Sequence, residues 1–183
     1  MSFMRLLSLA SLAATLCACG NIQTIKSFST PYQEPAQGAR ARIRVLSDGM
    51  VRAVPNSACV DWRLEGAGVM ASPTKGFANM NNRKLGMPQS AAQTLVAQSH
   101  FASTELYVPA GRPLVLDYLS QGNGSYQCFV RRTFVPAEGR DYEAVFWQEG
   151  SVCRFRVGTI SEAATPEAVA LAPAGLCRAS DNL

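Results

Sequence analysis

Short runs of alternating apolar and polar residues fill most of the chain between residues 41 and 157. The first run alternates Ala, Ile and Val with Arg42 and Arg44, and a Ser-Asp-Gly turn leads into the next run. Alternation with a period of two is typical of strands that bury one face, and turn residues recur between the runs at roughly ten-residue spacing. The pattern predicts an all-β fold, an antiparallel β-sandwich of about seven strands. The expected strands are residues 41–45, 51–54, 104–108, 114–118, 126–134, 142–147 and 153–157.

One long irregular loop is predicted between the second and third of these strands. Residues 66–88 are rich in Gly and Asn and show little periodicity, and loops of this length usually carry function. Phe77, Met80 and Met87 are the candidate contacts through which such a binding loop would hold an apolar partner. The alternative is a surface loop that folds back on the sheet.

The N-terminus has the layout of a secretory signal. Residues 1–18 combine a short basic head, an apolar run too short for the ~20 residues that cross a bilayer, and small residues at the end. The sequence Leu16-Cys17-Ala18-Cys19 that ends this segment resembles the lipobox of bacterial lipoproteins. The resemblance implies that Cys19 becomes the acylated N-terminus, and that Gly in place of Asp after it directs the protein to the outer membrane. The alternative is an ordinary cleaved signal that leaves Cys19 as a free thiol.

The remaining chain divides into a tether and one domain. Residues 19–39, polar and containing two prolines, are predicted as the lipidated N-terminus and a flexible tether. Residues 40–183 have the length of a single β-sandwich domain. Within it, a Thr-Pro-Glu sequence has the cap and the first-position proline of a helix start, so a short C-terminal helix is predicted over residues 165–171.

Four cysteines remain in the mature chain, namely Cys59, Cys128, Cys153 and Cys177. An even number in an exported protein indicates two disulfides, for which three pairings are possible. Cys128 and Cys153 both occupy inward-facing positions of expected strands, which favours that pair and leaves the other two to join. Metal binding is the alternative, although the chain has one histidine and no C-x-x-C spacing. No cofactor or metal is predicted.

A wider resemblance supports the expected fold. Residues 108–157 contain a Pro-Ala-Gly turn, the sequence FVPAEGRDYEAVF and a last strand with a cysteine. This segment resembles small uncharacterised proteobacterial outer-membrane lipoproteins. The resemblance implies an immunoglobulin-like or transthyretin-like β-sandwich, and it implies fold more than function, because sandwiches serve many unrelated roles.

Charge and chemistry favour a binding role. The chain carries 17 Lys and Arg against 13 Asp and Glu, an excess too mild to indicate nucleic-acid binding. The single histidine and the missing catalytic motifs predict a protein that is not an enzyme. Arg42, Arg44, Arg154 and Arg156 are expected on the outer faces of the first and last strands. If these strands were neighbours, the face would bind carboxylate or phosphate groups bidentately; the alternative is a solvated face that prevents aggregation.

These features together predict a lipoprotein anchored by its N-terminal lipid to the periplasmic face of the outer membrane. We expect a non-enzymatic accessory or interaction module of a cell-envelope assembly, with an envelope protein as its partner. The alternative is a binding protein for an anionic envelope glycan or lipid.

Overall fold

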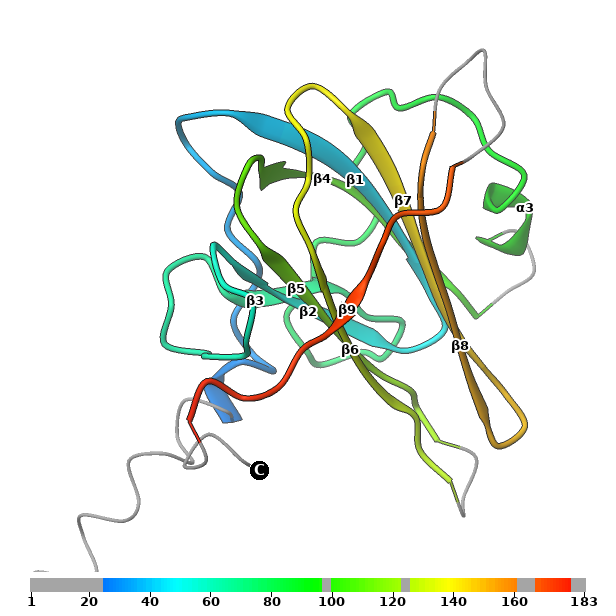
Figure 1. Ribbon diagram of the computed structural model, residues 1–183. Coiled ribbons are helices and arrows are strands. Elements are labelled where there is room, and N and C mark those ends of the chain that lie inside the picture. Colours follow the sequence, from blue (N-terminus) through cyan, green and yellow to red (C-terminus); the bar gives the residue numbers. More distant parts are fainter. Residues whose placement is uncertain (1–24, 97–99, 123–125, 161–166, 179–183) are drawn as a thin grey trace, which may run out of the picture.

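The computed structural model describes residues 25–96, 100–122, 126–160 and 167–178 (Figure 1). The expected signal peptide and the expected lipidation site, Cys19, lie outside these residues. Within the described ranges, no helix is long and apolar enough to cross a membrane.

Two β-sheets form the two layers of the fold, which confirms the expected all-β class (Figure 1). One sheet has the strand order β4-β1-β7-β8 and the other has the order β3-β2-β5-β6-β9. The strands are β1 (Arg40–Ser47), β2 (Met50–Pro55), β3 (Gly68–Ala71), β4 (Ala102–Pro109), β5 (Leu114–Leu119), β6 (Phe129–Phe134), β7 (Asp141–Glu149), β8 (Val152–Thr159) and β9 (Ala172–Pro173), with a one-turn helix α3 (Gln93–Val96) before β4.

Each of the seven expected strands has a counterpart in the structure, and two features differ from expectation. The structure adds β3, inside the segment expected as an irregular loop, and the two-residue β9. In addition, β1 pairs with β7 in parallel, so the expectation of purely antiparallel pairing is wrong at this one ladder. Two parallel strands must be joined by a long connection. Here the connection from β1 to β7 contains five strands: β4, in the same sheet, and β2, β3, β5 and β6, in the other sheet.

The core lies between the sheets and is built from the inward halves of the alternating runs. Ile43 of β1 and Leu116 of β5 are among its fully buried members. Aromatic rings join the layers: Tyr118 of β5 stacks on Phe146 of β7, with ring centroids 5.4 Å apart. Such pairs stabilise a fold beyond the area that they bury.

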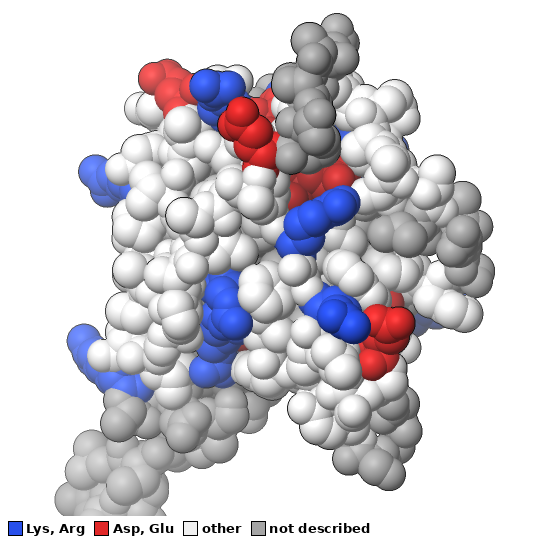
Figure 2. Space-filling view, turned by 45° about the vertical axis from the view of Figure 1, so that its right-hand side comes forward, with Lys and Arg blue, Asp and Glu red and all other residues white. Residues whose placement is uncertain are grey.

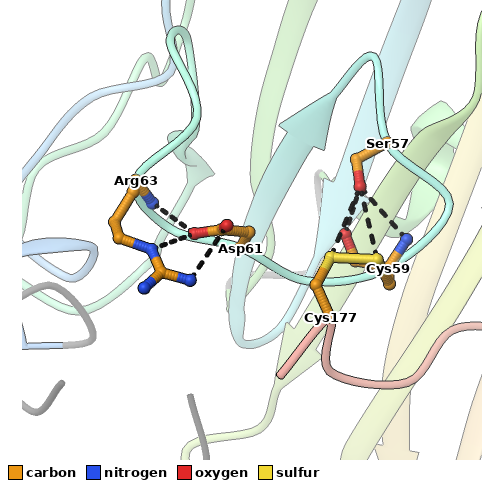
Figure 3. The surroundings of a disulfide bond; sticks show 5 residues. All are labelled: Ser57, Cys59, Asp61, Arg63 and Cys177. Carbon is orange, nitrogen blue, oxygen red and sulfur yellow. Dashed lines mark hydrogen bonds and ion pairs between the residues drawn. A yellow bond between two sulfur atoms is a disulfide. The ribbon is translucent and has the colours of Figure 1, made fainter. Parts of the chain in front are cut away.

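Both disulfides expected from the sequence are present. Cys128, just before β6, bonds to Cys153 of β8 and so links the two sheets at one edge. Cys59 bonds to Cys177, which fastens the C-terminal segment beside the chain that leaves β2 (Figure 3). The backbone of Val60 strengthens this junction, because its N–H donates to the Gly175 carbonyl at 2.8 Å and its carbonyl accepts from the Cys177 N–H at 3.0 Å.

The described part of the expected tether packs against the domain. Thr30 accepts a hydrogen bond from the N–H of Val69 in β3, and Tyr32 donates one to the Val69 carbonyl at 2.9 Å. The Tyr32 side chain is buried in the core. The assignment of residues 19–39 to a flexible tether is therefore wrong for residues 27–34, because β3 offers them an unpaired edge and the core offers the Tyr32 ring a site.

The expected C-terminal helix is absent from its described part. Residues 165 and 166 lie outside the description, and residues 167–171 run extended. Glu167 accepts a hydrogen bond from the Thr159 N–H at 2.9 Å, and Val169 donates one to the Val157 carbonyl at 3.0 Å. The backbone groups that a helix would use internally are thus taken by the edge of β8.

Candidate functional site

Arg44 is the centre of a buried charge network on the outer side of the first sheet. Its side chain is 0% exposed, so the expectation that it contributes to an exposed arginine face is wrong. Strand register places Glu105 of β4 on one side of Arg44 and Glu143 of β7 on the other. The guanidinium donates to Glu105 Oε1 at 2.9 and 3.1 Å and to Glu143 Oε2 at 3.3 Å. Each of the three guanidinium nitrogens thus donates to a carboxylate, and a buried charge is tolerated when it is paired and hydrogen-bonded in this way.

The segment before α3 covers this network. Arg44 donates to the Met87 carbonyl at 3.1 Å, while the N–H groups of Leu85 and Met87 donate to Glu105 at 2.5 and 3.3 Å. Ser90 donates to Glu143. Burial raises the pKa of Glu105, but the hydrogen bonds from Leu85, Arg44 and Met87 outweigh burial and hold that pKa below its ordinary value. The charges therefore fasten the covering segment to the sheet.

This cover changes the interpretation of the expected binding loop. Met87, which belongs to the covering segment, is buried, and Met80 is partly buried against the core, so neither is a free apolar contact. Of the three residues singled out, Phe77 remains exposed, at 42%, and its ring lies 6.4 Å from that of Phe28. At Met80 and Met87 the Gly- and Asn-rich loop therefore folds back on the sheet, which was the alternative to a binding loop.

Arg42 is also engaged. Its guanidinium donates to both carboxylate oxygens of Asp141, each at 2.6 Å. This hydrogen bonding raises the pKa of Arg42 above its ordinary value. Arg42 is partly exposed, but Asp141 already accepts the two parallel hydrogen bonds with which the guanidinium would bind another carboxylate or a phosphate.

A second buried arginine, Arg52, lies on the outer side of the other sheet. Its guanidinium carbon lies 4.0 Å from the Phe28 ring centroid and 4.1 Å from that of Trp62, and the guanidinium donates to Asp117 at 2.5 Å. Burial lowers the pKa of Arg52, and Asp117 opposes that shift. The arrangement fastens the segment around Phe28 to the sheet.

Sequence reasoning did not single out Arg52 or Asp117. One signal was available, because each is a lone charged residue inside an otherwise apolar run, at a position where only a paired charge is tolerated. Trp62 is buried, and its ring stacks on the Arg52 guanidinium.

Arg154 and Arg156 of β8 are the exposed members of the expected arginine face. Their side chains are 51% and 58% exposed. Arg154 contacts Glu149 at 3.1 Å, and Arg156 lies 3.7 Å from Glu143. The four arginines of the predicted face lie in one sheet, but β7 separates those of β1 from those of β8, so they do not form one continuous surface. Figure 2 shows basic groups separated by uncharged surface on the face it presents.

A pocket of about 230 Å³ lies beside Arg156. Glu143 and Glu167 also line it, together with Gly158 to Ile160 and Ala168. Two carboxylates in so small a space oppose the binding of a small anion there. Any acidic ligand of Arg156 is therefore expected to approach along the strand rather than enter the pocket.

The described residues hold no group of three or more His, Cys, Asp or Glu side chains that could bind a metal ion. His100, the single histidine, is exposed just before β4. Comparison with known proteins found no match for this chain among protein-family models, curated proteins or solved structures.

Proposed function

We propose that this protein is a lipoprotein of the outer membrane, on its periplasmic face, and that it acts as a non-enzymatic interaction module of a cell-envelope assembly. The lipobox-like sequence ending at Cys19 and the two disulfides support this proposal. Disulfides persist in oxidising compartments such as the periplasm. The two packed sheets suit an immunoglobulin-like or transthyretin-like sandwich, which is the fold type we propose.

The packed N-terminal segment limits how far such a domain can lie from the membrane. Ser27 is buried and accepts a hydrogen bond from Arg52 at 2.5 Å, so the chain is fixed to the domain from this residue onward. The nine residues from Cys19 to Ser27 are joined by eight residue-to-residue steps, which span at most ~29 Å when fully extended. A tether running to residue 39 would reach more than twice as far. The proposed partner must therefore come within a few tens of ångströms of the lipid surface.

The observation that carries the proposed binding role is the pair of exposed arginines on β8. Both guanidinium groups lie at the border of a sheet, and each has one incomplete carboxylate contact. Arg is enriched at the centres of protein interfaces because it combines an apolar stem with five hydrogen-bond donors. An acidic surface of an envelope protein would complete both contacts.

Binding of an anionic envelope glycan or lipid is the second candidate. It is favoured by the match between guanidinium and phosphate geometry. The acidic lining of the pocket beside Arg156 would repel a phosphate that enters it, whereas an extended protein surface can reach Arg154 and Arg156 along β8 without entering the pocket. We therefore rank the protein partner first.

The experiment is a pull-down from detergent-solubilised envelopes with the full-length lipidated protein as bait. The variant Arg154→Ser/Arg156→Ser is compared with Arg112→Ser/Arg140→Ser, a control that removes the same charge from exposed arginines in the turns before β5 and β7. We expect a defined protein to be lost with the first variant and retained with the control, and to survive moderate salt. Identical capture by both variants would refute the β8 site, whereas a glycan or lipid retained only at low salt would favour the second candidate.

A further inference from the structure

The hydrogen bonds at the end of β8 show which way its backbone groups point. Thr159 donates to the Glu167 carbonyl, and Val157 accepts from the Val169 N–H, so the main-chain groups of both residues face away from β7. In an antiparallel ladder, residues alternate between facing the partner strand and facing away from it. The N–H and C=O groups of Phe155 and Cys153 therefore also face away from β7, while those of Arg154 and Arg156 face it.

No described residue hydrogen-bonds to the main chain along this part of the edge. The C-terminal segment leaves β8 after Val169 and pairs instead with β6, through β9. The backbone of Cys153 and Phe155 consequently makes no hydrogen bond with any other part of the chain that the structure describes on that side.

Of the other outer strands, β4 and β3 are covered, and β9 is only two residues long. Ser103 of β4 accepts a hydrogen bond from the Asn82 N–H at 2.8 Å, and Glu105 donates one to the Arg83 carbonyl at 3.0 Å. On the other sheet, the segment around Tyr32 pairs with Val69 of β3. Uncovered edges are a liability that proteins usually remove, so the open half of β8 stands out.

The side chains around the open edge select its occupant. Arg154 and Arg156 project from one face of β8, and Arg132 of β6 lies over the Phe155 ring, 4.5 Å from its centroid. A second copy of this chain, paired antiparallel about Phe155, would place Arg154 opposite Arg156 twice, and like charges directly opposite each other are destabilising. An acidic strand would instead place a carboxylate opposite each guanidinium.

We propose that β8 accepts an extended acidic segment of a partner protein as an additional strand along Cys153 and Phe155. The inference rests on the proposed binding role and specifies how binding occurs. Because side chains alternate between the two faces of a strand, the segment would carry Asp or Glu at positions i and i+2, facing Arg154 and Arg156. Main-chain hydrogen bonds would supply affinity and the two carboxylates would supply selectivity, as in other cases of strand addition.

The test uses a pool of synthetic seven-residue peptides in which Glu or Asp alternates with Val, Ile, Thr or Tyr. A matched pool carries Lys at the acidic positions. The full-length lipidated protein in detergent is titrated with each pool, and amide hydrogen exchange is followed residue by residue by NMR. We expect the acidic pool alone to slow exchange at Phe155 and Cys153, while the amides of Arg154 and Arg156, already bonded to β7, change little.

Two variants at one position separate the backbone contact from the side chain. Phe155→Pro removes the outward N–H without taking a hydrogen bond from β7, and proline is tolerated in edge strands. Phe155→Ala removes the same ring and keeps the N–H. We expect the proline variant to bind the acidic pool about two- to tenfold more weakly than the alanine variant, the range that one net hydrogen bond supplies.

The outcomes distinguish this inference from the function on which it rests. Salt-sensitive binding that requires Arg154 and Arg156 but leaves exchange at Phe155 and Cys153 unchanged would overturn strand addition and leave the arginine site standing. Failure of the acidic pool to bind at all would also overturn strand addition, and the envelope pull-down would then decide the binding role separately. Equal binding of the basic pool would overturn the assignment of an acidic partner.

Discussion

Replacing Arg44 by Met removes the positive charge at the centre of the first buried network and keeps a side chain of similar length. Glu105 and Glu143, whose side chains are 3% and 5% exposed, then face each other's charge without a cation between them. Removing one partner of a buried ion pair typically costs ~3–5 kcal/mol of unfolding free energy, because a charge remains buried without compensation. At ~2–4 °C per kcal/mol for a domain of this size, the Tm is expected to fall by ~6–20 °C.

Urea and thermal unfolding of the full chain, followed by circular dichroism, measure this loss. Arg42→Met is the matched control, because Arg42 occupies the same strand and face but its ion pair with Asp141 is partly exposed. Exposed ion pairs contribute up to ~1 kcal/mol. If Arg44→Met lost no more stability than Arg42→Met, the reasoning about the buried network would be refuted.

Three further changes test other parts of the structure. Hydrogen bonds hold the pKa of Glu105 below its ordinary value of 4.5, so the stability that this carboxylate contributes is present above pH 4.5 and is lost as pH falls through the folded-state pKa. Glu105→Gln should therefore flatten the acid side of a plot of unfolding free energy against pH, and an unchanged plot would contradict this. Arg52→Lys keeps the charge but loses the flat guanidinium between two rings, so urea unfolding should show a loss of ~1–2 kcal/mol, whereas no loss would contradict the stacking argument. Cys59→Ala/Cys177→Ala should lower the unfolding free energy by ~2–5 kcal/mol, and an unaltered urea midpoint would show that this disulfide adds nothing.

The strands and the disulfide pairs could be predicted because their signals are local. Alternation indicates a half-buried strand whatever its neighbours are, and the same alternation places Cys128 and Cys153 on the inward-facing side of their strands. The two missed strands carry no such signal. β3 is a four-residue run that is buried throughout, and β9 is two residues long.

The state of Arg44 could not be predicted in the same way. The alternation correctly places it on the outer face of β1, but whether that face meets water depends on partners far away in the chain. Glu105 lies 61 residues from Arg44 and Glu143 lies 99 residues from it, and the covering segment around Met87 has no period that indicates its position. The packed segment around Tyr32 was missed for the same reason, because its partner is a strand that the sequence pattern does not reveal.

Intact-mass analysis of the protein extracted from native membranes, with and without alkylation and before any reductant is added, tests the central claim of an envelope lipoprotein. The account predicts a chain that begins at Cys19 and carries acyl groups, with Cys59, Cys128, Cys153 and Cys177 all protected from alkylation by their two disulfides. A chain that starts without acyl groups, or four thiols that react directly with the alkylating reagent, would contradict it.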